Sequence, residues 1–566
     1  MASATTRALL AVLFFAVPIV CSTRFMGAFA SPKWHLLVLC AFLLLMAQLS
    51  RPHALPVPRF LVDVRFALFA LAGLAVASCL RDGLPASAAP LVARAAGVAL
   101  VVALASELRV HPSSLGLIAG AVCVSASLIT AAGLAQLVGL DPLAALPGGD
   151  ERSAFFGNVN LAAQFLGFAV ILMLLQLGRS GRGMRAALEA LLAATLAYLH
   201  LLACRSVLIA LGVAALPWII ARRLAPATIV RTGAGAAALV LLITGPLETP
   251  ETRARVTLAH ANKALSSEIR LGLWSGTAAM VRDNPFGVGA GNFADRFVAY
   301  QADGALTPSE DLLYTAPHNE YLRVTAEEGW LFAVLIAALG GAFLLALDRA
   351  PAVSRWRSEP GVLIGSLLAY GAIEAFFQFP LATACGLLAI AFAVAFGLSV
   401  LPVDDRATFA PAWLRGAIAA ACGLALIVEG RLVASEWLVV RGPEDRAGLE
   451  DACRLDPRNS EACVRAAWTQ VRDGDRPAAV ATLDGVLRRQ PRYFPAVKLL
   501  GESLLWWGDR ETGCAALWLY DGLFQHASSA RQKRRRLCPG DEVADYGGRM
   551  RVPWYGDFPL PPAPEP

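Results

Sequence analysis

The sequence predicts an all-α, polytopic membrane protein: a bundle of about 12–13 transmembrane helices, a large loop between two of them and a C-terminal helical-repeat domain. Of its 566 residues, 57% are hydrophobic and only 16% are charged, which lies outside the range of soluble proteins. Apolar stretches of about 20 residues, long enough to cross a bilayer, recur from Ala8 to about Ile427. The lipid bilayer is therefore the expected solvent for most of the chain.

Polar breaks between the apolar stretches give the expected order of the spans. The spans lie near 8–22, 34–50, 60–80, 90–107, 114–138, 153–178, 186–203, 205–221, 229–245, 329–347, 361–379, 382–401 and 412–428. The first stretch follows Arg7 and also resembles the core of a secretory signal peptide. We favour a first span, because the next apolar stretch follows almost at once and no cleavage site is followed by a soluble domain.

Lys and Arg in the short loops predict the orientation, because loops rich in these residues stay in the cytoplasm. With a cytoplasmic N-terminus, the inner loops hold Arg51, Arg59, Arg109, Arg179, Arg182, Arg185, Arg222, Arg223, Arg349, Arg355, Arg357 and Arg406. The outer short loops hold fewer, chiefly Arg24, Lys33, Arg81 and Arg152. The same alternation places the long loop 246–328 outside. It also places the C-terminal part outside, provided that the stretch 416–428 crosses the membrane.

The composition turns soluble near Asp445, and the chain divides into a membrane part (1–430), a helical domain (431–540) and a Pro-rich tail (541–566). In the helical domain, a Pro at a turn and a Gly-Asp step recur after about 34 residues, which resembles tetratricopeptide repeats. An unrelated bundle of helical hairpins is the alternative. Either arrangement favours protein binding over catalysis. The inward-facing residues are expected to be Ala466, Ala467, Trp468, Ala478, Leu483 and Leu487. The basic run 531–536 indicates a solvated face, with lipid headgroup contact as the alternative.

The eleven cysteines fall into two groups. Seven lie in or beside apolar spans, where cysteine is a small hydrophobic residue. The other four lie in the helical domain without the close spacing of a metal site, and outside the cytoplasm they can form disulfides. We expect Cys453 to pair with Cys463, because these two residues flank a Pro-containing turn between adjacent helices.

Polar residues concentrate in three passages of the long loop. The segment 268–274 opens a helix-like passage with apolar residues at helical spacing, which can lie along the membrane surface. The Gly-rich stretch 284–293 is weak evidence for a phosphate site, because no strand precedes it and no Lys follows it. The stretch 317–322 contains His318, which can accept a proton near neutral pH. The alternative is a structural histidine that caps or hydrogen-bonds the following helix.

Polar residues also stand at the outer ends of two spans. Arg205 is costly at that depth unless it is partnered, which makes it a functional candidate. Snorkelling of its side chain to the interface is the alternative. The carboxamides of Asn158, Asn160 and Gln164 can bind either sugar hydroxyls or neighbouring helices.

These residues, in this order, resemble the bacterial O-antigen ligase and O-antigen polymerase superfamily. The resemblance covers roughly residues 30–400 and is specific to the superfamily rather than to one member. It is carried by Gly157-Asn158-Val159-Asn160, the Arg205-Ser206 step, Arg270, Trp274, the stretch 284–289, the stretch 318–322 and Glu327-Glu328-Gly329. The helical domain is an addition that occurs with several branches of the superfamily.

The resemblance implies a metal-independent glycosyltransferase without a cofactor. Such an enzyme moves a glycan from undecaprenyl pyrophosphate to an acceptor hydroxyl at the periplasmic face of the bacterial inner membrane. Arg205 and Arg270 match positions that stabilise the leaving pyrophosphate, and His318 matches the position proposed as base or orienter. Glu327 is expected either to hold the imidazole or to contact sugar. The expected substrate-binding residues are Asn158, Asn160, Gln164, Trp274, Asn319 and Glu327. We expect a sugar of the lipid A core as the acceptor; the alternatives are another carrier-linked glycan in a polymerase and a protein Ser or Thr in an oligosaccharyltransferase.

The expected partners are the lipid-linked donor, the acceptor, membrane lipids and a protein bound by the helical domain, but no nucleic acid. A transporter of lipid-linked glycans is a competing interpretation, although it would need paired repeats of broken helices, and the sequence shows no duplicated halves. A scaffold that only anchors its C-terminal domain would have no use for His318, Arg270 and Arg205 at one membrane face. The only Asp-x-Asp, at 473–475, lies at a helix junction, which argues against a metal-using nucleotide-sugar enzyme.

Overall fold

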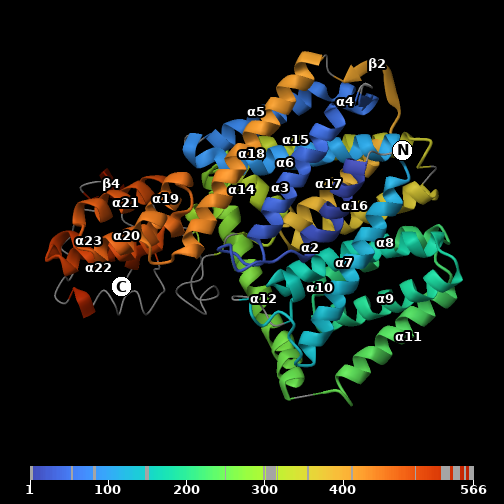
Figure 1. Cartoon of the computed structure of the whole chain (residues 1–566), viewed down its shortest axis with the longest axis horizontal. Helices are drawn as coiled ribbons and strands as arrows, with labels where there is room; N and C mark the ends of the chain where they lie inside the picture. The colour runs from blue at the N-terminus through green and yellow to red at the C-terminus, as the bar shows by residue number, and fades with distance from the viewer. Residues whose placement is uncertain are drawn as a thin grey trace.

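The computed structural model consists of a large helical bundle and a smaller helical domain that projects from one side of it (Figure 1). It describes residues 4–51, 55–80, 84–146, 152–248, 250–297, 300, 314, 316–353, 356–409, 412–490, 493–523, 536–538, 549–552 and 556–559. Of the predicted tail 541–566, only 549–552 and 556–559 belong to these residues, and most of the basic run 531–536 lies outside them.

The bundle and its long loop are built almost entirely from helices. In chain order they are α1 (Ala4–Ala11), a π-helical turn (Val12–Ala16), α2 (Val17–Ile19), α3 (Ser31–Leu49), α4 (Arg59–Asp63), α5 (Arg65–Leu80), α6 (Leu84–Val110), α7 (Ser114–Leu137), α8 (Val159–Arg179), α9 (Arg182–Leu201), α10 (Arg205–Ile220), α11 (Pro226–Ile243), α12 (Pro250–Asp283), α13 (Phe293–Phe297), α14 (Glu320–Glu328), α15 (Trp330–Arg349), α16 (Glu359–Phe377), α17 (Ala384–Val400) and α18 (Ala412–Arg441).

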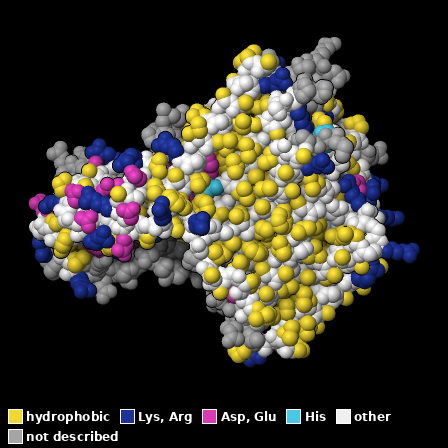
Figure 2. All heavy atoms as spheres, viewed as in Figure 1, with side chains coloured by type: hydrophobic (Ala, Val, Ile, Leu, Met, Phe, Trp, Pro, Cys, Tyr) yellow, Lys and Arg dark blue, Asp and Glu magenta, His cyan; other side chains and the backbone are white. Residues whose placement is uncertain are grey.

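Within the described residues, nine helices are long and apolar enough to cross a membrane, and four more apolar helices are shorter. Every predicted span overlaps one of them, so the predicted all-α polytopic fold is confirmed. Figure 2 shows a broad apolar surface over the bundle, with charged side chains on the small domain and along the opposite edge. This pattern is the one expected of a protein surrounded by lipid, because lipid-facing side chains gain nothing from being polar.

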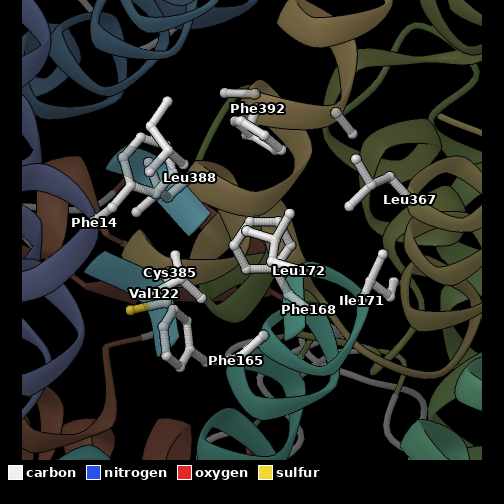
Figure 3. Close-up of a cluster of buried hydrophobic side chains, with 14 of the residues drawn as sticks. Phe14, Val122, Phe165, Phe168, Ile171, Leu172, Leu367, Cys385, Leu388 and Phe392 are labelled. Carbon is white, nitrogen blue, oxygen red and sulfur yellow. The ribbon is translucent and has the colours of Figure 1, made fainter. Parts of the chain in front are cut away.

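The core of the bundle contains closely packed aromatic and aliphatic side chains (Figure 3). The ring of Phe392 lies edge-on to Phe14 and Phe168, at centroid distances of 5.7 and 5.8 Å. Glycine allows one close approach that shapes the site described below. A Cβ at Gly167 would lie 2.2 Å from the hydroxyl oxygen of Tyr370, so only glycine lets α16 approach α8 this closely. Packing of this kind stabilises helix pairs in lipid, where the hydrophobic effect between helices is absent.

Contacts between loops agree with the predicted alternation of sides. Arg179 pairs with Glu359, which joins two loops expected inside. Strand β1 (Leu55–Pro58) pairs antiparallel with β2 (Val403–Phe409), and both strands lie in segments that were also expected inside. On the other side, Lys33 donates hydrogen bonds to the carbonyl oxygens of Val20 and Phe155, at 2.5 and 2.8 Å. Figure 1 shows the N-terminus on the side of the bundle opposite to the small domain.

The long loop is more helical than predicted. Helix α12 begins at Pro250, well before the expected start near Glu268, and continues unbroken to Asp283. The prediction was wrong because only the apolar positions after 268 were used, although no proline follows Pro250 before residue 285. Figure 1 shows α12 crossing the direction of the bundle helices rather than running parallel to them. Its buried Leu273 and Met280 pack against α13 and α14.

The Gly-rich stretch caps a helix. The N–H groups of Val288 and Gly289 donate to the carbonyl oxygens of Ala326 and Glu327 at the end of α14, both at 2.9 Å. Gly287 has a φ of +78°, and a Cβ there would lie 2.3 Å from the Glu327 carbonyl oxygen. The glycines are therefore needed for this close backbone approach.

The small domain continues directly from α18 through α19 (Arg446–Leu455), α20 (Ser460–Arg472), α21 (Arg476–Arg489), α22 (Phe494–Trp506) and α23 (Arg510–Leu523). The predicted boundary at 430/431 falls inside α18, which is one continuous helix of 30 residues. The helices pack as successive hairpins, and Gly474 and Gly508 end equivalent helices with φ of +76° and +82°. A second short antiparallel pair, β3 (Arg549–Val552) and β4 (Gly556–Pro559), follows. Assignment of these hairpins to tetratricopeptide repeats stays a prediction.

Two disulfides are present in this domain. The predicted pair Cys453–Cys463 is confirmed, and Cys514 pairs with Cys538. The prediction that Trp468 faces inward was wrong, because its side chain is 46% exposed and stacks under the guanidinium of Arg472. Ala467 takes the inward position, one residue earlier on the same helix.

The small domain contacts the long loop. A guanidinium nitrogen of Arg458, at the turn between α19 and α20, donates to the side-chain oxygen of Asn292 at 2.9 Å. The small domain and the Gly-rich stretch therefore lie on the same side of the bundle.

Candidate functional site

His318 lies in the long loop, two residues before α14, in an unusual backbone conformation. Its φ is +51°, a region that a residue with a side chain rarely adopts, and such strain is often found at functional sites. The imidazole Nδ1 lies 3.4 Å from Oε1 of Gln378, and the ring packs edge-on against Phe379 at 5.1 Å. Because a carboxamide oxygen only accepts hydrogen bonds, this contact requires a proton on Nδ1. The lone pair of His318 is then on Nε2.

Two neighbouring residues fix the position of His318. The indole N–H of Trp274, on α12, donates to the carbonyl oxygen of Pro317 at 2.9 Å. The side-chain oxygen of Asn319 accepts from the backbone N–H of Leu322 at 3.0 Å and so caps α14. These contacts use the only N–H group of the Trp274 side chain and the carboxamide oxygen of Asn319. Only the indole face and the Asn319 amide group remain for a substrate.

Arg270 and His318, both predicted site residues, are brought together. The pKa of His318 is lowered by burial and by the positive charge of Arg270, while the contact with Gln378 acts in the opposite direction. A histidine with a lowered pKa is neutral at pH 7 and can accept a proton. Within the part of the chain that the structure describes, the half-buried guanidinium of Arg270 forms no hydrogen bond or ion pair.

Arg205 directly follows Cys204, and Cys204 lies near Arg270. The charge of Arg270 interacts with Cys204, which directly precedes α10. The Cys204 thiol donates to the side-chain oxygen of Asn160 at 3.5 Å. Arg205 itself is exposed, and it makes no hydrogen bond or ion pair with the residues that the structure describes. Asn160, Arg205 and Arg270 therefore lie around one region at the outer ends of α8 and α10.

Two predicted substrate-binding residues have clear structural partners. The side-chain oxygen of Asn158 accepts from the backbone N–H of Asn160 at 2.8 Å and caps α8. The carboxylate of Glu327 accepts from Arg323 at 2.7 Å, and Arg323 also pairs with Glu320. The imidazole of His318 contacts Gln378 instead of Glu327.

Gln164 lines a cavity of about 250 Å³ between α8, α16 and α17. Most of its wall is apolar, with Phe168, Leu367, Ile390 and Val394 among the lining residues. Glu374 lines the same cavity one turn before the outer end of α16. The cavity thus combines an apolar interior with a small polar part near the outer face.

Glu374 and Gln378 are the residues of this region that the sequence reasoning missed. Glu374 had a signal, because an ionisable residue inside an apolar span is a functional candidate by default. The predicted site consists of loop residues and residues at span ends, whereas Glu374 lies inside a span. Gln378 had no comparable signal, since nothing in the sequence indicates that the end of α16 returns to His318.

Among the described residues, no group of three or more His, Cys, Asp or Glu side chains has the arrangement of a metal site. The positive groups of the site are guanidinium groups, and they can hold a doubly charged phosphate group through paired hydrogen bonds. The arrangement can therefore combine a neutral base with two guanidinium groups that have no carboxylate partner in the described part of the chain.

No curated protein matches the chain significantly. Residues 162–337 match a family model described as O-antigen ligase. This range includes Gln164, Arg205, Arg270, Trp274, His318, Asn319 and Glu327, whereas Asn158, Asn160, Glu374 and Gln378 lie outside it. The chain is therefore a multi-pass membrane protein of which residues 162–337 are similar to O-antigen ligases.

Proposed function

We propose that the protein transfers a glycan from undecaprenyl pyrophosphate to an acceptor hydroxyl, and that the acceptor is a sugar of the lipid A core. The observation that carries the proposal is the guanidinium of Arg270, which has no hydrogen-bond or ion-pair partner among the described residues, beside a neutral His318. A cation that holds the leaving group and a base that accepts the proton are the two functions that this reaction needs.

The arginines act on the donor. As the bond between the anomeric carbon and the pyrophosphate oxygen breaks, negative charge develops on undecaprenyl pyrophosphate. Arg205 and Arg270 stabilise that charge by bidentate hydrogen bonds, and no metal ion is needed for this step. Their lack of carboxylate partners within the described residues supports this role, because a paired guanidinium would first have to release its partner.

His318 acts on the acceptor. Its Nε2 takes the proton of the attacking hydroxyl while the oxygen forms a bond to the anomeric carbon. The protonated imidazole then returns the proton to solvent or to the leaving group. Asn158, Asn160, Gln164, Trp274, Asn319 and Glu327 are proposed to contact the sugars with the groups that their structural hydrogen bonds leave free.

We place this reaction at the periplasmic face of the bacterial inner membrane. The distribution of Lys and Arg over the short loops supports this placement. The disulfides of the small domain support it too, since disulfides persist in oxidising compartments and the small domain contacts the long loop. The helical hairpins are then available to a protein partner on the same side.

A reconstituted assay tests the proposal. The purified chain in proteoliposomes receives undecaprenyl pyrophosphate carrying a glycan repeat, together with lipopolysaccharide that lacks O-antigen. We expect glycan-capped lipopolysaccharide and free undecaprenyl pyrophosphate, with neither product in the His318→Ala variant. Longer carrier-linked glycan instead would indicate a polymerase, and glycan moved across the bilayer without bond formation would indicate a transporter. Either result would contradict ligation.

A further inference from the structure

Glu374 is a buried carboxyl group that forms no hydrogen bond with the described residues, although the positive charge of Arg270 acts on it. Its side chain is 1% exposed, and neither carboxyl oxygen forms a hydrogen bond with the described residues. Two neighbouring carboxamides are in the same state: the amide nitrogens of Gln164 and Gln378 are buried and also lack a hydrogen-bond partner there. Buried polar groups are almost always hydrogen-bonded, so three such residues near one another require an explanation.

The proximity of Gln164 and Glu374 does not explain why these buried groups lack hydrogen bonds. The Gln164 amide lies close enough to interact with the Glu374 carboxyl group, but the two do not reach hydrogen-bond geometry. A small movement that joined them would still leave the second carboxyl oxygen and the Gln378 amide without partners.

The other buried carboxyl groups of the bundle show what a purely structural role looks like. Glu107 is also fully buried, but it accepts hydrogen bonds from Arg51, Gln48 and Ser114, at 2.8 to 2.9 Å. Glu328 pairs with Arg94. A buried acceptor without a donor destabilises the folded protein, and such groups are retained where a ligand supplies the missing bonds.

The cavity provides room for a ligand at Glu374. Glu374 and Gln164 both line it, and its volume of about 250 Å³ is close to the lower end of ligand pockets, about 300 Å³. Gln378 is not part of the cavity wall, but its backbone N–H donates to the carbonyl oxygen of Glu374 at 2.7 Å. Its side-chain oxygen contacts the imidazole of His318, and its amide nitrogen has no hydrogen-bond partner among the described residues.

The free groups are complementary to sugar hydroxyls. The carboxyl oxygens of Glu374 accept hydrogen bonds, and the amide groups of Gln164 and Gln378 donate them. A hydroxyl group both donates and accepts, so neighbouring hydroxyls of one sugar can satisfy all three residues. A phosphate group would be repelled by the negative charge of the carboxyl group. A metal cation would be disfavoured by the two amide groups, which present N–H donors.

We propose that Glu374, with Gln164 and Gln378, binds hydroxyl groups of the acceptor sugar and orients it toward His318. This inference rests on the proposed function, because it is the transferase reaction that requires an acceptor beside the base. The acceptor is favoured over the donor sugar because Gln378, four residues after Glu374, contacts the base itself. Glu374 is then a specificity-determining residue that lies outside the matched range 162–337.

Kinetics of Glu374→Gln and Glu374→Met test this role. Loss of hydrogen bonds to a charged group should raise the KM for O-antigen-free lipopolysaccharide about 10- to 100-fold. The increase should be larger in Glu374→Met than in Glu374→Gln. The KM for the carrier-linked glycan should stay within about twofold, and the thermal midpoint of unfolding should not fall, because no internal bond is lost. The matched control is Glu107→Gln, which should lower that midpoint without a selective effect on the acceptor.

A second measurement does not depend on turnover. A hydrophobic carbodiimide modifies buried carboxyl groups, and mass spectrometry reports the fraction of Glu374 that has reacted. We expect O-antigen-free lipopolysaccharide to protect Glu374, and undecaprenyl pyrophosphate alone not to do so. Protection by undecaprenyl pyrophosphate alone, or by neither compound, would overturn the inference.

The two measurements separate the inference from the proposed function. If the wild-type protein transfers glycan but the Glu374 variants have unchanged acceptor KM, the inference fails and the proposed function stands. If the wild-type protein transfers nothing yet lipopolysaccharide protects Glu374, the acceptor subsite stands and the proposed function fails.

Discussion

The side-chain oxygen of Gln378 lies 3.4 Å from Nδ1 of His318, and this contact joins the end of α16 to the loop before α14. It leaves Nε2 as the proton acceptor of the imidazole. Because the contact is long and the ring also packs on Phe379, the imidazole is held in orientation without being paired to a carboxylate. A base of this kind stays neutral, and its activity depends on the charges around it.

Replacement of His318 by Ala should reduce glycan transfer by about 100- to 10,000-fold, the usual contribution of a general base. Expression, membrane insertion and the thermal midpoint should be close to those of the wild type. The matched control is His111→Ala, at the opposite end of the bundle, which should transfer glycan normally. Normal transfer by the His318 variant would exclude this residue as the base.

Replacement of Arg205 or Arg270 by Lys should reduce transfer at least about 100-fold, because an ammonium group lacks the planar fork that holds two phosphate oxygens. Arg282→Lys serves as the control on the same helix as Arg270, since its exposed side chain pairs only with Asp283 among the described residues. Full activity in either site variant would show that only the positive charge matters there, or that the residue has no role.

The pH profile should report the charge of Arg270. Because burial and Arg270 lower the pKa of His318, the acidic limb of kcat/KM for transfer should have its midpoint below about 6.5. Activity is lost as His318 becomes protonated with falling pH. In Arg270→Gln the residual activity should show a midpoint shifted upward, since one cause of the lowered pKa is removed. An unchanged midpoint in that variant would contradict the pairing of the two residues.

Transfer should continue in the presence of EDTA, because the proposed positive charge on the leaving group comes from two guanidinium groups. The purified protein is assayed with and without the chelator, and then with added Mg²⁺ or Mn²⁺. Activity that disappears with EDTA and returns with a divalent ion would replace the arginine mechanism by a metal-assisted one.

The cysteines of the small domain should be accessible from outside the cell membrane. In intact spheroplasts, a membrane-impermeant thiol reagent should label Cys453, Cys463, Cys514 and Cys538 only after treatment with an impermeant reductant, because the disulfides protect them. Ser113→Cys, in a predicted inner loop, is the control and should react only after lysis. Tail thiols that also react only after lysis would show that the domain is cytoplasmic and that α18 does not cross the membrane.

The fold was predictable because a bilayer leaves few choices. Every backbone polar group in lipid must be bonded internally, so a long apolar stretch becomes a helix whatever its neighbours are. The disulfide between Cys453 and Cys463 was predictable for a similar local reason, since the two residues flank one turn. The early start of α12 was missed because its first half carries many polar residues, and an apolar pattern is a poor guide there.

The candidate site was predictable only in part. Arg270 and His318 were found by their chemistry, but only the packing of α12 against α14 shows that they meet. The partner of Glu327 was available from the sequence, because Arg323 stands four residues earlier on the same helix. Asn158 and Asn319 stand directly before a helix, where asparagine is a common cap, and both side chains cap their helices in the structure.

Helix α18 passes without a break from the bundle into the small domain, and Arg458 holds that domain against the long loop. A protein that binds the hairpins is therefore tethered close to the site rather than merely attached to the same membrane. Its encounter with the site becomes intramolecular, with an effective concentration on the order of millimolar for a short tether. Even a weakly binding partner that delivers or removes glycan would then work at a high local concentration. Breaking the Arg458 contact would lower that concentration without altering any group that touches substrate.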